Sequence, residues 1–172
     1  LALDAAAVGE SYNVAIGLGA MTSVDEGTAG GDADYNVAVG YNALEGGDFA
    51  GNDRQLQGNI AIGAHAMDST GTNAQTGTIA IGHSALTALT SGAANVAIGY
   101  RAASATTNSA GNVAIGHDAM RLCSVSDGHN VAIGHGVMDG GTGGYYNICI
   151  GKDAWAAFAN ANVGTCVLIG HE

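Results

Sequence analysis

Asn95-Val-Ala-Ile-Gly99 is one of nine similar copies of one phrase, and the same five residues also begin at Asn13, Asn112 and Asn130. Each copy ends in glycine. The nine glycines are Gly17, Gly40, Gly63, Gly82, Gly99, Gly116, Gly134, Gly151 and Gly170. Successive glycines are 23, 23, 19, 17, 17, 18, 17 and 19 residues apart. Repeats of this length indicate a solenoid, in which each repeat packs only against its neighbours.

The residues before each glycine alternate in size, which predicts a short β-strand. The positions one and three before the glycine hold Ile or Val in all nine copies, and the position between them holds Ala in seven. This period of two places the Ile/Val pair on one face and Ala on the other. We expect the β-branched pair to point into the coil and the alanines to form a flat outer face that another subunit could approach.

A second apolar element follows each glycine after two variable residues, as in Ala43-Leu44 and Ala66-Met67. We therefore predict coils made of a strand, a tight turn, a short second strand and a variable loop. The apolar runs are too short for helices and glycine interrupts them. This makes the chain one all-β domain over residues 1–172, a parallel β-solenoid of about nine coils, longer over 12–81 and shorter over 82–170. At one strand spacing per coil, the rod is about 40 Å long.

Asparagine stands four residues before the glycine in seven of the nine copies. Stacked in neighbouring coils, these side chains would form a column of hydrogen-bonded amides. The alternative is that Asn merely tolerates the turn conformation at this position. The sequence leaves both interpretations open.

The charge of the chain excludes several partners. Its net charge is −11, from 15 acidic and 4 basic residues, which argues against nucleic acid and against anionic membrane surfaces. Ten of the acids lie at or before Asp68. No stretch approaches the roughly 20 apolar residues of a membrane span, so we expect no membrane insertion. Aromatic residues are few, and oligomerisation would supply burial that one chain lacks.

Three cysteines form no paired framework. Cys149 and Cys166 occupy positions that Ala and Asn hold elsewhere, which favours buried free thiols, with a Cys149–Cys166 disulfide as the alternative. His117 and His135 follow glycines of adjacent coils, so they should stack. They are weak candidates for a metal site, although a solvated turn residue is the simpler interpretation.

The aromatic residues outside the core pattern are candidates for binding a glycan, because flat rings can stack on the apolar faces of sugars. The candidate binding residues are Phe49, Tyr41, Tyr100 and Tyr145. We find no catalytic constellation and no cofactor motif, and we expect no enzyme activity. The acid pairs Asp25-Glu26 and Asp32/Asp34 leave a polysaccharide hydrolase open as an alternative.

From Tyr12 to Gly170 the chain resembles the YadA-like head repeat of trimeric autotransporter adhesins, which also occurs in phage tail fibres. The Val-Ala-Ile-Gly core and the phrase Tyr41-Asn42-Ala43-Leu44 carry the resemblance. It implies a left-handed parallel β-roll and a homotrimer around a common axis.

The resemblance also implies a function. We expect a structural and adhesive segment of a longer viral (phage) tail fibre or spike, on the virion surface and outside the cell. Its partners would be two further copies, other fibre proteins and a host-surface glycan or protein. A bacterial adhesin head on the bacterial outer surface is the alternative, because the long connections and the lack of a stalk favour the virus only modestly. An ice-binding solenoid is disfavoured because Thr is scattered.

Overall fold

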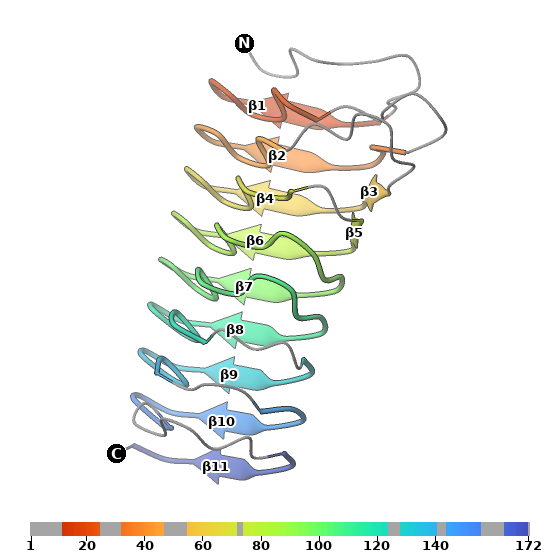
Figure 1. The fold of residues 1–172 in the computed structure, drawn as a ribbon. Helices are drawn as coiled ribbons and strands as arrows, with labels where there is room; N and C mark the ends of the chain where they lie inside the picture. Colours follow the sequence, from red (N-terminus) through yellow and green to blue (C-terminus); the bar gives the residue numbers. More distant parts are fainter. Residues whose placement is uncertain are drawn as a thin grey trace.

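The computed structural model describes residues 12–24, 32–46, 55–71, 74–123, 128–140, 144–155 and 164–171. These residues contain β-strands and turns but no helix. Nine three-residue strands stack in sequence order into one sheet, from β1 beside the N-terminal end to β11 at the C-terminal end (Figure 1). They are β1 (Val14–Ile16), β2 (Val37–Val39), β4 (Ile60–Ile62), β6 (Ile79–Ile81), β7 (Val96–Ile98), β8 (Val113–Ile115), β9 (Val131–Ile133), β10 (Ile148–Ile150) and β11 (Val167–Ile169).

The strands pair in parallel and in register, so that each residue lies opposite its equivalent in the next repeat. Val96 pairs with Val113 and Ala97 with Ala114. The predicted parallel solenoid is therefore confirmed. The described residues form about seven turns, and the expected count of nine coils remains a prediction. We call each strand with its terminal glycine a rung.

The glycine at the end of each strand is required because the backbones of successive rungs lie very close together. At Gly99 the φ angle is 137°, and an added Cβ would lie 2.3 Å from the carbonyl oxygen of Gly116. No side chain fits at that distance, and L-residues rarely adopt that φ. The same clash with the next rung recurs at each repeat glycine from Gly17 to Gly151. The glycine thus allows the backbone to stack on itself.

The expected orientation of the strands is wrong. The central alanines point into the coil, and Ala38, Ala61, Ala80, Ala97 and Ala114 have no exposed surface. The Ile/Val pairs point outward and are half-exposed or exposed. The coil interior is thin: behind the strand lie the residues of the second apolar element, which are themselves buried. The narrow space accepts a methyl group and leaves no room for a branched side chain.

The second apolar element is a turn and not the predicted short strand. Its larger residue has a left-handed backbone in every coil described, with φ of 53° at Met21, 48° at Leu44 and 53° at Met120. The residue two before it is also left-handed, as at Asn42 and Asp118. Two left-handed residues in each turn fold the chain back sharply, which directs the apolar side chain under the strand. The buried column reads Met21, Leu44, Met67, Leu86, Ala103, Met120, Met138 and Trp155.

The asparagine column is a hydrogen-bonded ladder. The Oδ1 atom of Asn112 accepts from the backbone N–H of Asn130 at 3.0 Å and from its Nδ2 at 3.1 Å. The Nδ2 of Asn130 also donates to the carbonyl oxygen of Gly144 at 2.9 Å. The side chains are almost fully buried, so the ladder satisfies polar backbone groups that water cannot reach. Of the two interpretations, the amide ladder is the one observed.

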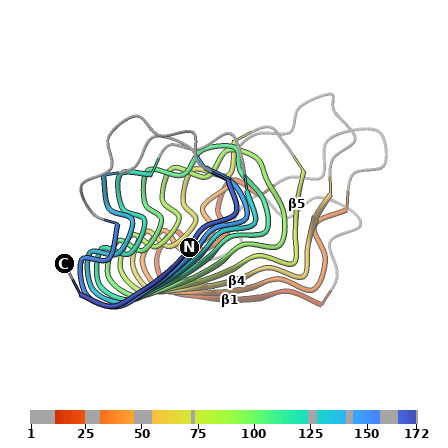
Figure 2. The same cartoon turned by 90° about the horizontal axis from the view of Figure 1, so that it is seen from below.

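The longer coils carry a second, two-stranded parallel sheet. Its strands are β3 (Leu56–Gln57) and β5 (Gln75–Thr76), and an isolated bridge between Asp32 and Gln55 extends the pairing by one coil. Seen along the solenoid axis, the nine-stranded sheet forms one side of the coil, and the longer coils reach further out beyond β5 (Figure 2). The extra residues of these coils thus widen the cross-section without changing the rungs.

Candidate functional site

The outer face of the nine-stranded sheet is entirely aliphatic. We call it the aliphatic face; it consists of the Ile and Val residues one and three before each repeat glycine. At its two ends it is strongly exposed, with 59% of the Ile16 surface and 70% of the Ile169 surface open to solvent. Parallel sheets are normally covered on both faces. Here the turns cover the inner face, and none of the described residues covers the outer one.

A column of rings, edge-on at His65 and stacked from His83 onward, runs beside the aliphatic face, where the strands end. We call it the aromatic column; its members are Tyr41, His65, His83, Tyr100, His117 and His135. Ring centroids are 5.0–6.0 Å apart, and His117 and His135 lie 5.0 Å apart and nearly parallel. This spacing is close to that of the strands, so the sheet sets the stacking.

The stacking of His117 on His135 is as expected, but His65 is a member that the sequence pattern missed. It stands two residues after its glycine, whereas the other members follow theirs directly. Ala64 occupies the usual position in that rung, so the ring of the next residue continues the column. The one sign in the sequence that His65 belongs to the column is that it directly follows this alanine.

The structure puts Tyr41 and Tyr100 in one column but does not bring the four candidate glycan-binding residues together. Both faces of Tyr100 are occupied, by His83 at 5.5 Å and His117 at 5.0 Å, with the Arg101 guanidinium also 5.0 Å from its ring centroid. Such a ring offers its edge to a ligand and not its face. Phe49 lies outside the described residues.

Tyr145 belongs to another part of the surface. Its ring packs edge-on against Tyr146, with 5.6 Å between the centroids, and Tyr146 stacks on His129 at 5.3 Å. This group lies before the strands rather than after them. The rings at the two ends of a strand therefore form separate surfaces.

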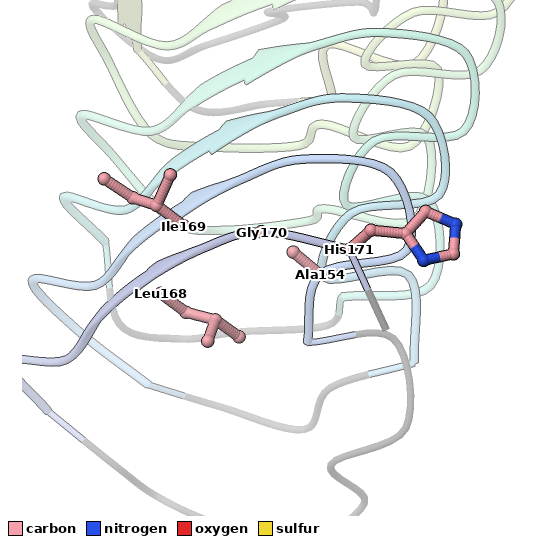
Figure 3. Close-up of a pocket in the computed structure, with 5 residues that line it drawn as sticks. All are labelled: Ala154, Leu168, Ile169, Gly170 and His171. Carbon is pink, nitrogen blue, oxygen red and sulfur yellow. The ribbon is translucent and has the colours of Figure 1, made fainter.

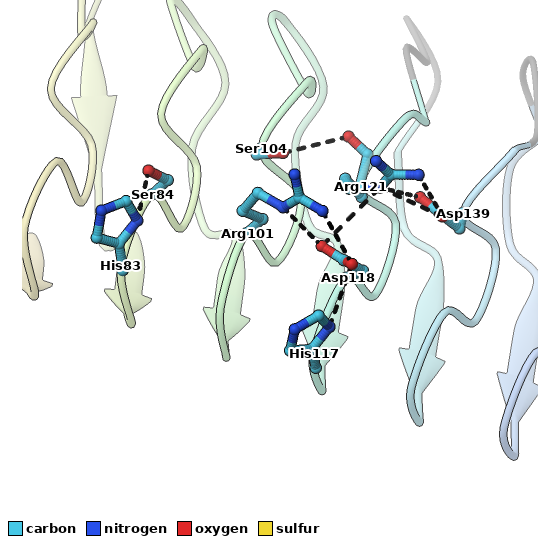
Figure 4. A network of polar contacts seen from close by, with 8 residues as sticks. All are labelled: His83, Ser84, Arg101, Ser104, His117, Asp118, Arg121 and Asp139. Carbon is cyan, nitrogen blue, oxygen red and sulfur yellow. Dashed lines mark hydrogen bonds and ion pairs between the residues drawn. The ribbon is translucent and has the colours of Figure 1, made fainter.

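Ion pairs link three of the shorter coils beside the aromatic column (Figure 4). Arg101 forms two hydrogen bonds to Asp118, at 2.9 and 3.0 Å, and Arg121 binds Asp139 at 2.9 Å. The hydrogen bond from Arg101 holds the pKa of Asp118 below its ordinary value, and the nearby charges of Arg101, His117 and Arg121 act in the same direction. The sequence carries a signal for this ladder, because Arg101 and Asp118 hold equivalent positions 17 residues apart.

Neither a metal site nor a paired-acid site emerges from the described residues. They contain no group of three or more His, Cys, Asp or Glu side chains placed to hold a metal ion. Asp32 is exposed and accepts a hydrogen bond from Gln57 at 3.1 Å, a contact between coils of the solenoid. Asp25 and Glu26 lie outside the described residues.

All three cysteines are free. Burial, together with a neighbouring thiol, raises the pKa of Cys123 and of Cys149 to about 11. A thiol with this pKa is almost entirely protonated at neutral pH and reacts slowly. The free-thiol interpretation is confirmed, and the Cys149–Cys166 disulfide is absent.

A hollow of about 130 Å³ lies at the C-terminal end of the stack (Figure 3). Its lining residues are Ala154, Leu168, Ile169, Gly170 and His171. The lining is mostly apolar, and Leu168 stands where most rungs have Ala. This hollow lies beside the last described rung, and its lining holds one titratable residue, His171.

Comparison of the chain with protein-family models, with curated proteins and with solved structures finds no match. Among the described residues, no helix is long and apolar enough to cross a membrane. The function must therefore be argued from the surfaces of the solenoid itself.

Proposed function

We propose that this chain is a structural and adhesive segment of a trimeric fibre, in which three copies cover one another's aliphatic faces. The observation that carries the proposal is the unbroken Ile/Val surface on the outer side of a parallel sheet. Burial of such a surface releases on the order of 25 cal/mol per Å². A continuous apolar surface of this kind marks an interaction site.

The periodicity of the aliphatic face favours another copy of the same chain as the partner. The face repeats once per strand, about every 4.8 Å, along the whole sheet. A partner that packs into it along its full length needs the same repeat, and an identical solenoid has it. Cyclic association of identical chains closes the assembly and leaves no aliphatic face open. A left-handed roll and three chains follow from the resemblance to YadA-like head repeats and remain part of the proposal.

The solenoid would give the fibre stiffness, and the connections on its other sides would meet the target. Rungs of backbone hydrogen bonds extend along one axis, so the segment resists bending. The connections vary in length from coil to coil, while the rungs do not. Three chains and many fibres would multiply weak contacts to a host-surface glycan or protein. The role requires no catalysis and no cofactor.

We favour a viral tail fibre on the virion surface over a bacterial adhesin head, because the connections here are long relative to those of the adhesin repeat. The two hypotheses differ in whether a virus or a bacterium makes the protein. Both give the segment the same structural role and place it outside the cell. No contact among the described residues favours a polysaccharide hydrolase specifically.

Mass in solution tests the proposal. Light scattering on the unmodified chain should report about three times the 16.8 kDa of one chain. Replacing Ile98 and Ile115 with Asp should give folded monomers, because two charges per chain would otherwise be buried. The matched control is Leu122→Asp, on an exposed aliphatic residue outside the aliphatic face, and it should remain trimeric. A monomeric unmodified chain would overturn the proposal.

A further inference from the structure

When three sheets surround one axis, each edge of a sheet lies next to an edge of a neighbouring sheet. This determines which residues of adjacent copies meet. If each aliphatic face is turned toward the axis, the three sheets form the sides of a triangular prism. At each corner of the prism, the strand ends of one copy meet the strand starts of the next, which is a head-to-tail contact. This step rests on the proposed function.

The aromatic column is the surface that each copy brings to the corner from its strand ends. Its rings remain accessible, with 50% of the Tyr41 surface and 44% of the Tyr100 surface exposed. The stack is held from within: His117 lies 3.1 Å from Asp118, and Asp118 in turn binds Arg101 (Figure 4). It is a preformed ridge of rings, and large rigid rings are typical anchors of protein interfaces.

The opposite edge of the sheet, where the strands start, has space in its central rungs for the aromatic column of a neighbouring copy. We call it the strand-start edge; it is formed by the residues five before each repeat glycine, and all nine have a left-handed φ. In the central rungs this residue is Gly58, Gly77 or Ala94, and all three are exposed. A Cβ added at Gly58 or Gly77 would meet nothing within 4 Å. Tyr35 precedes this stretch, and Gly111 follows it, where an added Cβ would lie 2.5 Å from Nδ1 of His129.

The two edges therefore complement each other in the central rungs. In the rung of β6, Gly77 begins the strand and His83 follows it; in the rung of β7, Ala94 begins it and Tyr100 follows. In a cyclic assembly whose axis runs along the stack, equivalent rungs of all copies lie at one height. In these central rungs each ring thus faces a small residue of its own rung in the next copy, whereas at the two ends of the column Tyr41 faces Tyr35 and His135 faces His129.

We propose that the aromatic column of each copy docks against the strand-start edge of the next copy, in the same register. The partner at this seam is a second copy of the chain. The ridge supplies the ring edges, and the neighbour's small residues leave space for them. The seam and the aliphatic face together close the assembly.

Paired cysteines test the seam. The chain carrying both Ala94→Cys and Tyr100→Cys should be joined by a short bis-maleimide into covalent trimers, seen in a denaturing gel. Either single variant should give none, because in a head-to-tail contact a residue never meets its own copy. A second pair, His129→Cys with His135→Cys, makes the same test in another rung if the first variant does not fold. The unmodified chain shows the background from the native cysteines.

A displaced pair tests the register. Ala94→Cys with His135→Cys places the two thiols two rungs apart, about 10 Å along the axis, and should yield at least tenfold less covalent trimer. Cross-linking by a single variant would overturn the head-to-tail seam, and efficient cross-linking of the displaced pair would overturn the register. A trimeric mass without cross-links would refute the seam alone, whereas a monomeric mass would refute the fibre proposal itself.

Discussion

The longer coils over 12–81 and the shorter coils over 82–170 share the rung, the apolar turn and the asparagine ladder, but they differ in their connections. An added Cβ at Gly63 would lie 2.6 Å from the carbonyl oxygen of Gly82, and one at Gly99 would lie 2.3 Å from that of Gly116. Outside the rung, the longer coils carry the second sheet and most of the acids, while the shorter ones carry the ion pairs and the thiols. The rung is fixed by backbone geometry, so the connections can vary around it.

The two regions meet at a defect. Thr78 replaces asparagine in the rung of β6, and its Oγ1 is buried without a hydrogen-bond partner in the described structure. Its backbone N–H donates to Asn59 Oδ1 at 3.0 Å, which ends the ladder of the longer coils. The next ladder begins at Asn95, whose Oδ1 accepts from the Asn112 N–H at 2.9 Å.

The largest effect should come from the repeat glycines. Gly99→Ala and Gly63→Ala should each cost about 3 kcal/mol or more, because the methyl group meets a backbone carbonyl and the φ angle is unsuitable. Urea unfolding followed by circular dichroism measures the loss. Gly77→Ala is the control: its φ is 63° and its Cβ would face open space, so it should cost about 1 kcal/mol. If only one of the two glycine variants lost stability, the close backbone contact between successive rungs would not be common to the longer and the shorter coils.

A smaller loss is expected from the asparagine ladder. Asn112→Ala removes the acceptor of the buried Asn130 N–H and should cost about 2–3 kcal/mol. Asn36→Ala, its counterpart in the longer coils, should cost a similar amount, since Asn36 Oδ1 accepts from the Asn59 N–H at 3.0 Å. The exposed Asn108→Ala should change the free energy of unfolding by less than about 0.5 kcal/mol. Equal small effects at all three positions would argue that the ladder does not stabilise the solenoid.

Repairing the defect should stabilise the chain. Thr78→Asn gives the Asn95 N–H a side-chain acceptor and removes an unpartnered buried hydroxyl, so we expect a gain of about 1 kcal/mol. The same unfolding experiment measures it, and the two regions should then unfold more cooperatively. Thr78→Val is the matched control, because it removes the hydroxyl without joining the ladders. If Thr78→Val stabilised the chain as much as Thr78→Asn, the interruption of the asparagine ladder would not itself lower the free energy of unfolding.

The smallest effect should come from the ion pairs of the shorter coils. Because the pKa of Asp118 is lowered in the folded chain, its contribution is present above the ordinary aspartate pKa and is lost as the pH falls through the lowered value. Asp118→Asn should therefore lower the melting temperature by roughly a few degrees at pH 7 and by less at pH 2. Differential scanning calorimetry at both pH values measures this. A loss that grows toward acid would contradict the assignment.

The sequence was sufficient for the features that one rung imposes on the next. Glycine at a fixed position and alternation over three residues predict parallel strands, because stacked repeats place equivalent residues together. The stacking of His117 on His135 follows from the same rule. For the recurring asparagine, the sequence left an amide column and a residue that merely tolerates the turn both open.

The sequence was insufficient for the direction in which the strand faces. Alternation shows that Ala97 and Ile98 lie on opposite faces but not which one is inside, and both faces are apolar. The answer depends on how close the turn comes behind the strand, which two left-handed residues in each coil determine. Non-glycine residues such as Leu44 and Met120 give no sign of adopting that conformation. The candidate surface was misassigned for this reason: the alanines expected at a subunit contact are the core, and the aliphatic residues expected in the core form the outer face.

The asparagine ladder also has a direction. Among the described residues, the side-chain oxygens accept the backbone N–H of the following repeat, as Asn95 does for Asn112. A completed repeat therefore offers its side-chain oxygen to the next repeat, which the ribosome makes afterwards. Synthesis and stacking proceed the same way, so the molecule can form vectorially from its N-terminal end without waiting for distant segments.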